Sequence, residues 1–200
     1  MNTIVVTGAA GFIGSHTVVA LTAAGFTPVI IDDFSNSQPS VLQGLHQILG
    51  HEPRCYAENC CQADILRRIF KEENIGGVIH FAAFKAVGES MEQPLKYYDN
   101  NLGSLITLLR VMQEMGVPNL IFSSSCTVYG QPDFLPVTEE TPRQEAAQDA
   151  VVRVARRNRA VLVELVGHRL EQPSRRRLQP MDADRLLVAR PVLQADLHVV

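Results

Sequence analysis

Three glycines near the N-terminus are the residues of this chain best suited to ligand chemistry, in the string Thr7-Gly8-Ala-Ala-Gly11-Phe-Ile-Gly14. The string lies between an apolar, β-branched run at residues 3–8 and a helical pattern at residues 11–24. Glycines at this spacing allow a sharp turn, close approach of the backbone to a pyrophosphate, and tight packing of the helix on the strand. The N–H groups at the helix N-terminus then point at the anion. The arrangement predicts a turn that binds a dinucleotide.

Asp32 ends a second apolar run, at residues 27–33, and is a candidate partner for the adenosine ribose. Its carboxylate can accept hydrogen bonds from the ribose hydroxyls and would repel a 2′-phosphate. No arginine lies near this strand end to receive such a phosphate. We therefore predict NAD rather than NADP as the cofactor. Three glycines alone could be an ordinary turn, but the ordered series of strand, glycines, helix, strand and acidic residue favours nucleotide binding.

The rest of the N-terminal part alternates strand-like and helical patterns. Further apolar, β-rich runs occupy residues 54–58, 77–82 and 119–124, the first being the weakest. Helical patterns cover residues 64–74, with Asp64 as the expected N-cap, and residues 94–115, ending at Gly116. Buried strands separated by helices predict an α/β fold, a Rossmann-type doubly wound parallel sheet covered on both faces. Its ligands bind at the carboxyl ends of the strands, and His80 is expected in the strand core.

Composition narrows the partners of the protein. The formal net charge of −3 gives no polyanion-binding signature, so nucleic acid is not an expected partner. The apolar runs are short and the N-terminus lacks a basic, apolar leader, which predicts a cytoplasmic protein with no membrane association. The four cysteines have neither CxxC spacing nor neighbouring histidine pairs, and we expect idle thiols, no disulfide and no metal site: Cys55, Cys60, Cys61 and Cys126.

Charge is distributed unevenly along the chain. Residues 1–148 contain 8 Lys+Arg against 15 Asp+Glu, whereas residues 149–200 contain 10 against 6, and all ten basic residues there are arginine. The last aromatic residue is Phe134. This change predicts an NAD-binding domain at residues 1–148 and a divergent arginine-rich tail of uncertain structure at residues 149–200.

Three strings resemble a known family. The spacing of Gly8, Gly11 and Gly14 is similar to that of the extended short-chain dehydrogenase/reductase superfamily. Within it, residues 80–90, 97–101 and 122–130 closely resemble UDP-glucose 4-epimerases. Sugar-nucleotide dehydratases typically have an Asp-Glu pair just before the Val-Tyr-Gly string, where this chain has Cys126-Thr127. The resemblance implies oxidation of the sugar at C4 by NAD, return of the hydride to the opposite face, interconversion of UDP-glucose and UDP-galactose, and a homodimer.

The resemblance also implies roles for individual residues. The implied cofactor contacts are Gly8, Gly11, Phe12, Ile13 and Gly14 at the pyrophosphate, Asp32, Asn36 and Ser37 at the ribose, Asp64 and Ile65 at the adenine, and Phe81, Ala82, Lys85, Asn100, Ser123 and Ser124 around the remaining phosphate and nicotinamide side. Ser125 takes the position of the catalytic serine that hydrogen-bonds the reacting sugar hydroxyl. The serines could instead satisfy backbone groups at a strand end, and Lys85 could be a solvated loop residue.

One part of the family pattern is missing. The principal base is a tyrosine in a Tyr-x-x-x-Lys pair, whose lysine lowers the pKa of the phenol. No tyrosine follows Tyr129 and no lysine follows Lys96. The family also continues into a small C-terminal domain that grips the uridine nucleotide, and we expect most of the substrate pocket to be absent.

Two hypotheses account for the tail. A shifted reading frame after about residue 148 would explain its bias towards Arg, Val, Leu, Ala and Pro, and restoring the frame should then restore a Tyr-x-x-x-Lys string. A basic helix that binds nucleic acid or another partner is the functional alternative. The sequence therefore favours a truncated or frame-altered UDP-glucose 4-epimerase, with a non-catalytic NAD-binding protein as the main alternative. Another extended-family enzyme, such as a 5-epimerase or reductase, is less favoured by the string at residues 85–90.

Overall fold

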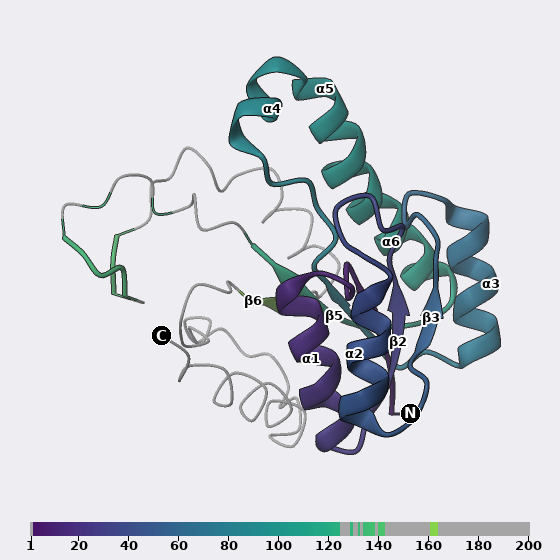
Figure 1. The fold of residues 1–200 in the computed structure, drawn as a ribbon. Helices are drawn as coiled ribbons and strands as arrows, with labels where there is room; N and C mark the ends of the chain where they lie inside the picture. The colour runs from purple at the N-terminus through teal and green to yellow at the C-terminus, as the bar shows by residue number, and fades with distance from the viewer. Residues whose placement is uncertain are drawn as a thin grey trace, which may run out of the picture.

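The computed structural model describes residues 2–124, 129, 132, 134–138, 140–142 and 161–163. Their centre is a parallel six-stranded sheet with the order β3-β2-β1-β4-β5-β6 (Figure 1). The strands are β1 (Thr3–Thr7), β2 (Thr27–Ile31), β3 (Arg54–Tyr56), β4 (Gly77–His80), β5 (Asn119–Ser123) and β6 (Val161–Val163). The predicted parallel, doubly wound sheet is confirmed, and the strand order reverses between β1 and β4, where such folds bind ligands.

Helices on both faces of the sheet connect the strands from β1 to β5. They are α1 (Phe12–Ala23), α2 (Ser40–Leu49), α3 (Ala63–Glu73), α4 (Val87–Glu92), α5 (Pro94–Tyr97), the π-helix η1 (Tyr98–Leu102) and α6 (Gly103–Glu114). The first predicted helix is confirmed. Gly25, just after it, and Gly116, predicted to end a helix, both have positive φ angles, as glycines that terminate helices do. The helices α2 and α4 were not predicted.

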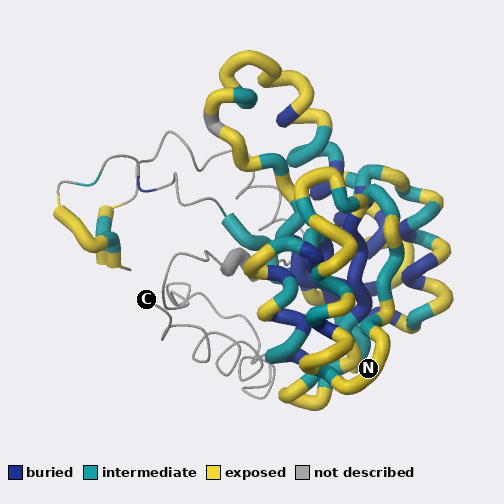
Figure 2. The backbone as a smooth tube through the Cα atoms, viewed as in Figure 1, coloured by how far each residue is buried: buried dark blue, intermediate teal, exposed yellow. Residues whose placement is uncertain are grey.

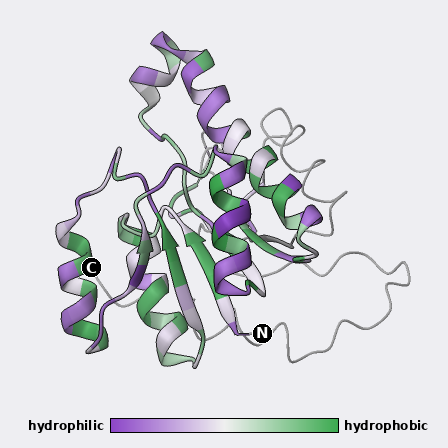
Figure 3. Ribbon diagram, turned by 90° about the vertical axis from the view of Figure 1, so that its right-hand side faces the viewer, coloured by the Kyte–Doolittle hydropathy of each residue, from purple (hydrophilic) through white to green (hydrophobic). Residues whose placement is uncertain are grey.

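The core consists of two apolar layers, one on each face of the sheet. Successive strand residues point to opposite faces, so Val5 packs in the layer beneath α3 and α6 while Val6 packs in the layer beneath α1 and α2. The strands are apolar at the centre of the molecule, and the helices carry polar residues on their outer sides (Figure 3). The near-continuous apolar strands of the sequence are explained by this double coverage.

Two predicted helices differ from the structure at their termini or centre. The helix expected at residues 64–74 begins at Ala63 with Gln62 as its N-cap, and Asp64 lies in the first turn, so the prediction of Asp64 as the cap was wrong. The helix expected at residues 94–115 is divided by the π-helix η1. A π turn accommodates one extra residue, which the apolar periodicity of the sequence does not reveal.

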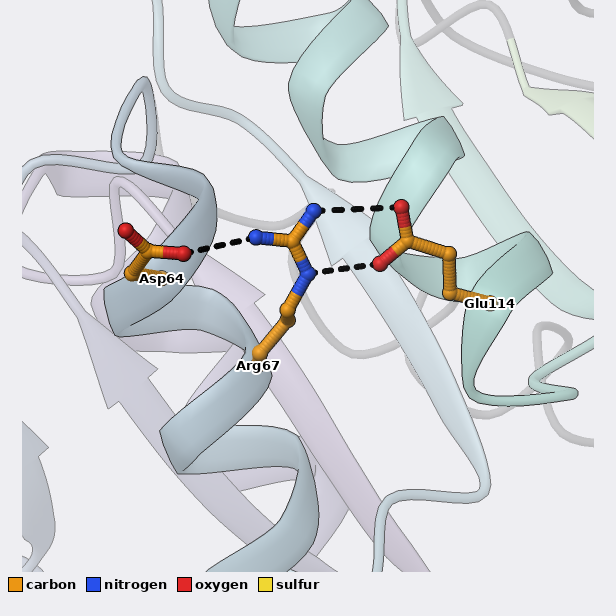
Figure 4. Close-up of polar contacts among 3 residues, drawn as sticks. All are labelled: Asp64, Arg67 and Glu114. Atoms are coloured by element: carbon orange, nitrogen blue, oxygen red, sulfur yellow. Dashed lines mark hydrogen bonds and ion pairs between the residues drawn. The ribbon is translucent and has the colours of Figure 1, made fainter.

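The helices differ in how they are held in the fold. Arg67 on α3 donates from Nε and Nη2 to the Glu114 carboxylate on α6 at 2.6 and 3.1 Å, and from Nη1 to Asp64 at 2.7 Å (Figure 4). By contrast, α4 and α5 extend beyond the sheet and are mostly exposed (Figure 2). No helix among the described residues has the length and apolar character needed to span a membrane.

The sheet does not end where the composition changes. Strand β6 comes from the arginine-rich segment and pairs in parallel with β5, with Ile121 opposite Val161 and Ser123 opposite Val163. The short apolar run at residues 160–163 is the sequence signal for this strand. The domain boundary near residue 148 stays a prediction.

Candidate functional site

The glycine loop connects β1 to α1 at the carboxyl edge of the sheet. Gly8 has φ +67° and donates its N–H to the Ile31 carbonyl at 2.9 Å. A Cβ at Gly8 would lie 2.7 Å from the backbone nitrogen of Ala82, and one at Gly14 would lie 2.5 Å from the Gly8 oxygen. Both neighbours are backbone atoms and cannot rotate away. The loop therefore requires glycine at these two positions, as the sequence predicts for a turn that approaches a ligand and packs a helix closely.

The first turn of α1 faces outward from this loop. Its N-cap is Gly11, which has no side chain to cap the helix, and none of the first-turn residues is acidic. The first backbone N–H groups of a helix have no intrahelical partner and favour anions. Phe12 and Ile13 are 81% and 44% exposed. Apolar side chains this open, beside backbone donors that have no intrahelical partner, suit a ligand with both phosphate and apolar parts.

Asp32 links the glycine loop to the segment after β2. Its buried carboxylate accepts hydrogen bonds from the Ala10 N–H at 2.9 Å, the Phe34 N–H at 2.9 Å and the Ser37 hydroxyl at 2.8 Å. A carboxylate has about four acceptor positions, so a further donor such as a ribose hydroxyl can bind. Sequence reasoning predicted this ligand role and missed the second role, in which Asp32 shapes both loops.

The loop after β4, residues 81–86, lies against the glycine loop. Thr7 holds its start, because the Phe81 N–H donates to the Thr7 carbonyl at 3.1 Å and the Ala82 N–H donates to the Thr7 hydroxyl at 3.3 Å. The same hydroxyl is hydrogen-bonded to Nδ1 of His80 at 2.6 Å. His80 is buried as predicted, and burial lowers the pKa of its imidazole to about 4. The imidazole is therefore neutral near pH 7.

Asn101 holds the middle of the same loop and was not predicted. Its Oδ1 accepts from the Phe84 N–H at 2.8 Å and its Nδ2 donates to the Phe84 carbonyl at 3.0 Å. Asn100, the predicted contact, donates from Nδ2 to Asn101 Oδ1 at 2.9 Å. Two adjacent asparagines inside a helical pattern are poor helix formers, and they are the signal that could have identified this position.

Comparison with known proteins gives the family of the chain. The model of the NAD dependent epimerase/dehydratase family matches residues 4–155. The chain belongs to this family. The match includes all the loops described above, together with the positions that carried the resemblance seen in the sequence.

Individual members of the epimerase/dehydratase family are similar over the same region. A UDP-glucose 4-epimerase of Neisseria meningitidis serogroup A is 49% identical over 142 residues, which are 71% of this chain and 42% of that protein. The structure of the Bifidobacterium longum UDP-glucose 4-epimerase in complex with NAD+ and UDP has a TM-score of 0.66 and 47% identity, covering 72% of this chain and 43% of that one. The Stenotrophomonas maltophila enzyme with bound NAD and formylated UDP-arabinopyranose has a TM-score of 0.67 and 41% identity, covering 72% and 43%. The chain thus spans about two fifths of the length of the curated relatives it matches.

The remaining predicted cofactor contacts lie at several places around the glycine loop, Asp32 and the loop after β4. Asp64 is exposed on α3, where it accepts from Arg67, and Ile65 packs partly against the core. Asn36 and Lys85 are exposed. The half-buried Ser123 and Ser124 lie at the end of β5, on the same edge of the sheet as the glycine loop. Ser125 and the Cys126-Thr127 pair lie outside the described residues.

The three thiols among the described residues are all held in the protonated form by burial. Burial, with a smaller contribution from the Asp32 carboxylate, raises the pKa of Cys55 to about 11, and burial raises the pKa of Cys60 to about 12. Burial likewise raises the pKa of Cys61, whose thiol donates to the Asn100 carbonyl at 3.7 Å. Among the residues that the structure describes, no three His, Cys, Asp or Glu side chains are grouped to hold a metal.

Proposed function

We propose that this chain binds NAD at the carboxyl edge of its sheet and that the site is the cofactor half of a UDP-glucose 4-epimerase. The observation that carries the proposal is the geometry of the glycine loop and Asp32. At Gly8 and Gly14 the backbone lies too close to other backbone atoms for a Cβ to fit, and the Asp32 carboxylate at the end of β2 accepts a hydrogen bond from the same loop. The NAD or NAD+ in the related epimerase structures supports it. When bound, NAD would accept a hydride from C4 of the sugar and return it.

Each part of the site has a distinct task in this proposal. The first turn of α1 binds the pyrophosphate through backbone N–H groups, and the exposed Phe12 and Ile13 cover it. The fourth acceptor position of Asp32 binds an adenosine ribose hydroxyl. The remaining predicted contacts border the adenine, the second phosphate and the nicotinamide ribose: Asn36, Ser37, Asp64, Ile65, Phe81, Ala82, Lys85, Asn100, Ser123 and Ser124.

The sugar chemistry rests on other residues. Ser125 would hydrogen-bond the 4-hydroxyl of the sugar and assist movement of its proton. The usual base, a tyrosine with its pKa lowered by a lysine four residues later, does not occur in the 200 residues. This sequence observation favours a second candidate function, an NAD-binding protein that does not turn over a UDP-sugar.

A binding experiment tests the cofactor site. NAD and NADP are titrated into the chain by calorimetry, and we expect NAD to bind at least about tenfold more tightly because the Asp32 carboxylate repels a 2′-phosphate. Asp32→Asn removes the negative charge and should reduce the difference in affinity between NAD and NADP. The matched control is Asp33→Asn. Asp33 is the exposed neighbour of Asp32, and its substitution should leave the difference in affinity unchanged. A chain that binds neither nucleotide contradicts the proposal.

A turnover experiment separates the two candidate functions. The purified chain is incubated with NAD and UDP-galactose, and formation of UDP-glucose is followed by chromatography. Conversion that is lost in Ser125→Ala supports the epimerase and contradicts the non-catalytic alternative. Tight NAD binding with no conversion supports the non-catalytic alternative. The result does not depend on the binding experiment, because the two readouts are measured separately.

A further inference from the structure

We propose that Asn101 is a positioning residue that fixes the loop after β4 so that this loop can bind the nicotinamide side of the cofactor. The inference rests on the proposed NAD site and assigns to it a residue beyond the expected cofactor contacts. Its basis is a pair of hydrogen bonds from one side chain to both backbone polar groups of Phe84.

The loop is held at two separate points. At its start, the Thr7 carbonyl and hydroxyl accept from the N–H groups of Phe81 and Ala82. Residues 83–86 lie beyond these two hydrogen bonds. Asn101 anchors their backbone at Phe84, beside Lys85. Both bonds are of ordinary length, 2.8 and 3.0 Å, and use the acceptor and donor of the same amide.

A neighbouring asparagine fixes the orientation of the Asn101 amide. Asn101 lies in η1, between α5 and α6. Asn100, in the same π-helix, donates its Nδ2 to the amide oxygen of Asn101 at 2.9 Å. That oxygen therefore accepts two hydrogen bonds, which fixes the orientation of the amide and directs its NH₂ group at the Phe84 carbonyl. Single π turns inside α-helices often occur at functional sites.

The Phe84 ring has contacts of its own, with two residues of α5. It packs against the Tyr97 ring at 5.6 Å between centroids, and the Lys96 ammonium lies 5.2 Å from its centroid. Glu89 joins the two partners, because its carboxylate accepts from the Tyr97 hydroxyl at 2.8 Å and from the Lys96 ammonium at 2.5 Å. Phe84 is thus held through its ring by α5, while Asn101 fixes its backbone.

The experiment compares Asn101→Ala with a control substitution, Asn119→Ala, at the start of β5. Asn119 also donates its amide to a backbone carbonyl before β4, that of Gly76 at 2.9 Å. We expect Asn101→Ala to speed amide hydrogen exchange at Phe84 by at least about tenfold and to weaken NAD binding by about tenfold. Asn119→Ala should change neither quantity.

ADP provides the readout that separates positioning from general loss of structure. ADP carries only the adenosine and pyrophosphate part, which the glycine loop and Asp32 would bind. Asn101→Ala should therefore leave ADP affinity unchanged while NAD affinity falls. An equal loss for both ligands, or unchanged exchange at Phe84, would overturn the proposal.

Two further outcomes are interpretable. If Asn101→Ala does not fold, Asn101→Asp replaces it, since the carboxylate still accepts from the Phe84 N–H but no longer donates to its carbonyl, and an intermediate NAD affinity is expected. If the unmodified chain binds neither NAD nor ADP, the proposed function fails. Exchange at Phe84 then decides by itself whether Asn101 fixes the loop.

Discussion

Asp32 and Ala10 are joined across two strand ends by a 2.9 Å hydrogen bond from the backbone N–H of Ala10 to Oδ2 of Asp32. The residue expected to bind the ribose therefore also determines the shape of the loop expected to bind the pyrophosphate. Loss of Asp32 should affect both parts of the site and the stability of the fold.

The first prediction concerns the stability contributed by this carboxylate. Asp32→Ala leaves the N–H groups of Ala10 and Phe34 without their acceptor and should lower the free energy of unfolding by about 3 kcal/mol. Asp33→Ala also removes two hydrogen bonds, to Ser35 and Asn59, but from an exposed side chain, so its effect should be much smaller. Urea denaturation measures both, and equal losses would contradict the explanation.

A second prediction separates glycines that are sterically required from one that is not. Gly14→Ala places a Cβ 2.5 Å from the Gly8 oxygen and should destabilise the chain by at least about 2 kcal/mol. Gly44→Ala, in the middle of α2, meets nothing within 4 Å and should stabilise it by about 0.5–1 kcal/mol. Thermal unfolding of the two variants should shift in opposite directions, and a shift in the same direction would refute the steric argument.

His80 should make stability depend on pH. Burial lowers the pKa of its imidazole from 6.5 to about 4, so between these values the unfolded chain binds a proton that the folded chain does not. The contribution of the neutral imidazole to the free energy of unfolding is fully present above pH 6.5. It is lost as the pH falls towards 4, by about 3 kcal/mol in total. Unfolding free energies measured from pH 7 to 4 should fall less steeply in His80→Asn, and parallel curves would contradict the prediction.

The thiols give a prediction that requires no substitution. The pKa of Cys55 is raised to about 11 and that of Cys60 to about 12, mainly by burial, so very little thiolate is present at neutral pH. Both should react with iodoacetamide much more slowly in the folded chain than in urea. Mass spectrometry of the labelled peptides measures this. Rapid labelling of Cys60 without unfolding would show that its burial is not maintained in solution.

Much of the fold was predictable because its strands are short, apolar and bounded by glycines or acidic residues. The runs that contain Val5, Val29 and Val78 gave the central strands directly, since burial on both faces removes polar residues from them. Helix α2 was missed although its apolar residues recur at helical spacing and pack against the core, at Val41, Leu42, Leu45 and Leu49; Gly44 in its middle, a poor helix former, weakens the pattern.

The candidate site was predictable at Gly8, Gly14 and Asp32, where steric or electrostatic requirements limit the residue type. Asn101 was missed because its importance depends on a contact with Phe84, 17 residues earlier in the chain. The cap at Asp64 was predicted wrongly because residue type alone does not determine which residue begins a helix. The prediction for Ser125 lies outside the described residues and stays a prediction.

The pairing of β1 with β4 has a consequence for how this protein folds. Thr7 and His80 are opposite each other in the parallel register and are separated by 73 positions along the chain. A contact of this range forms slowly, because a long loop must close before it is made. We therefore expect the glycine loop to lack its Ala82 neighbour until β4 has been synthesised, and the site to become able to bind a nucleotide late in folding.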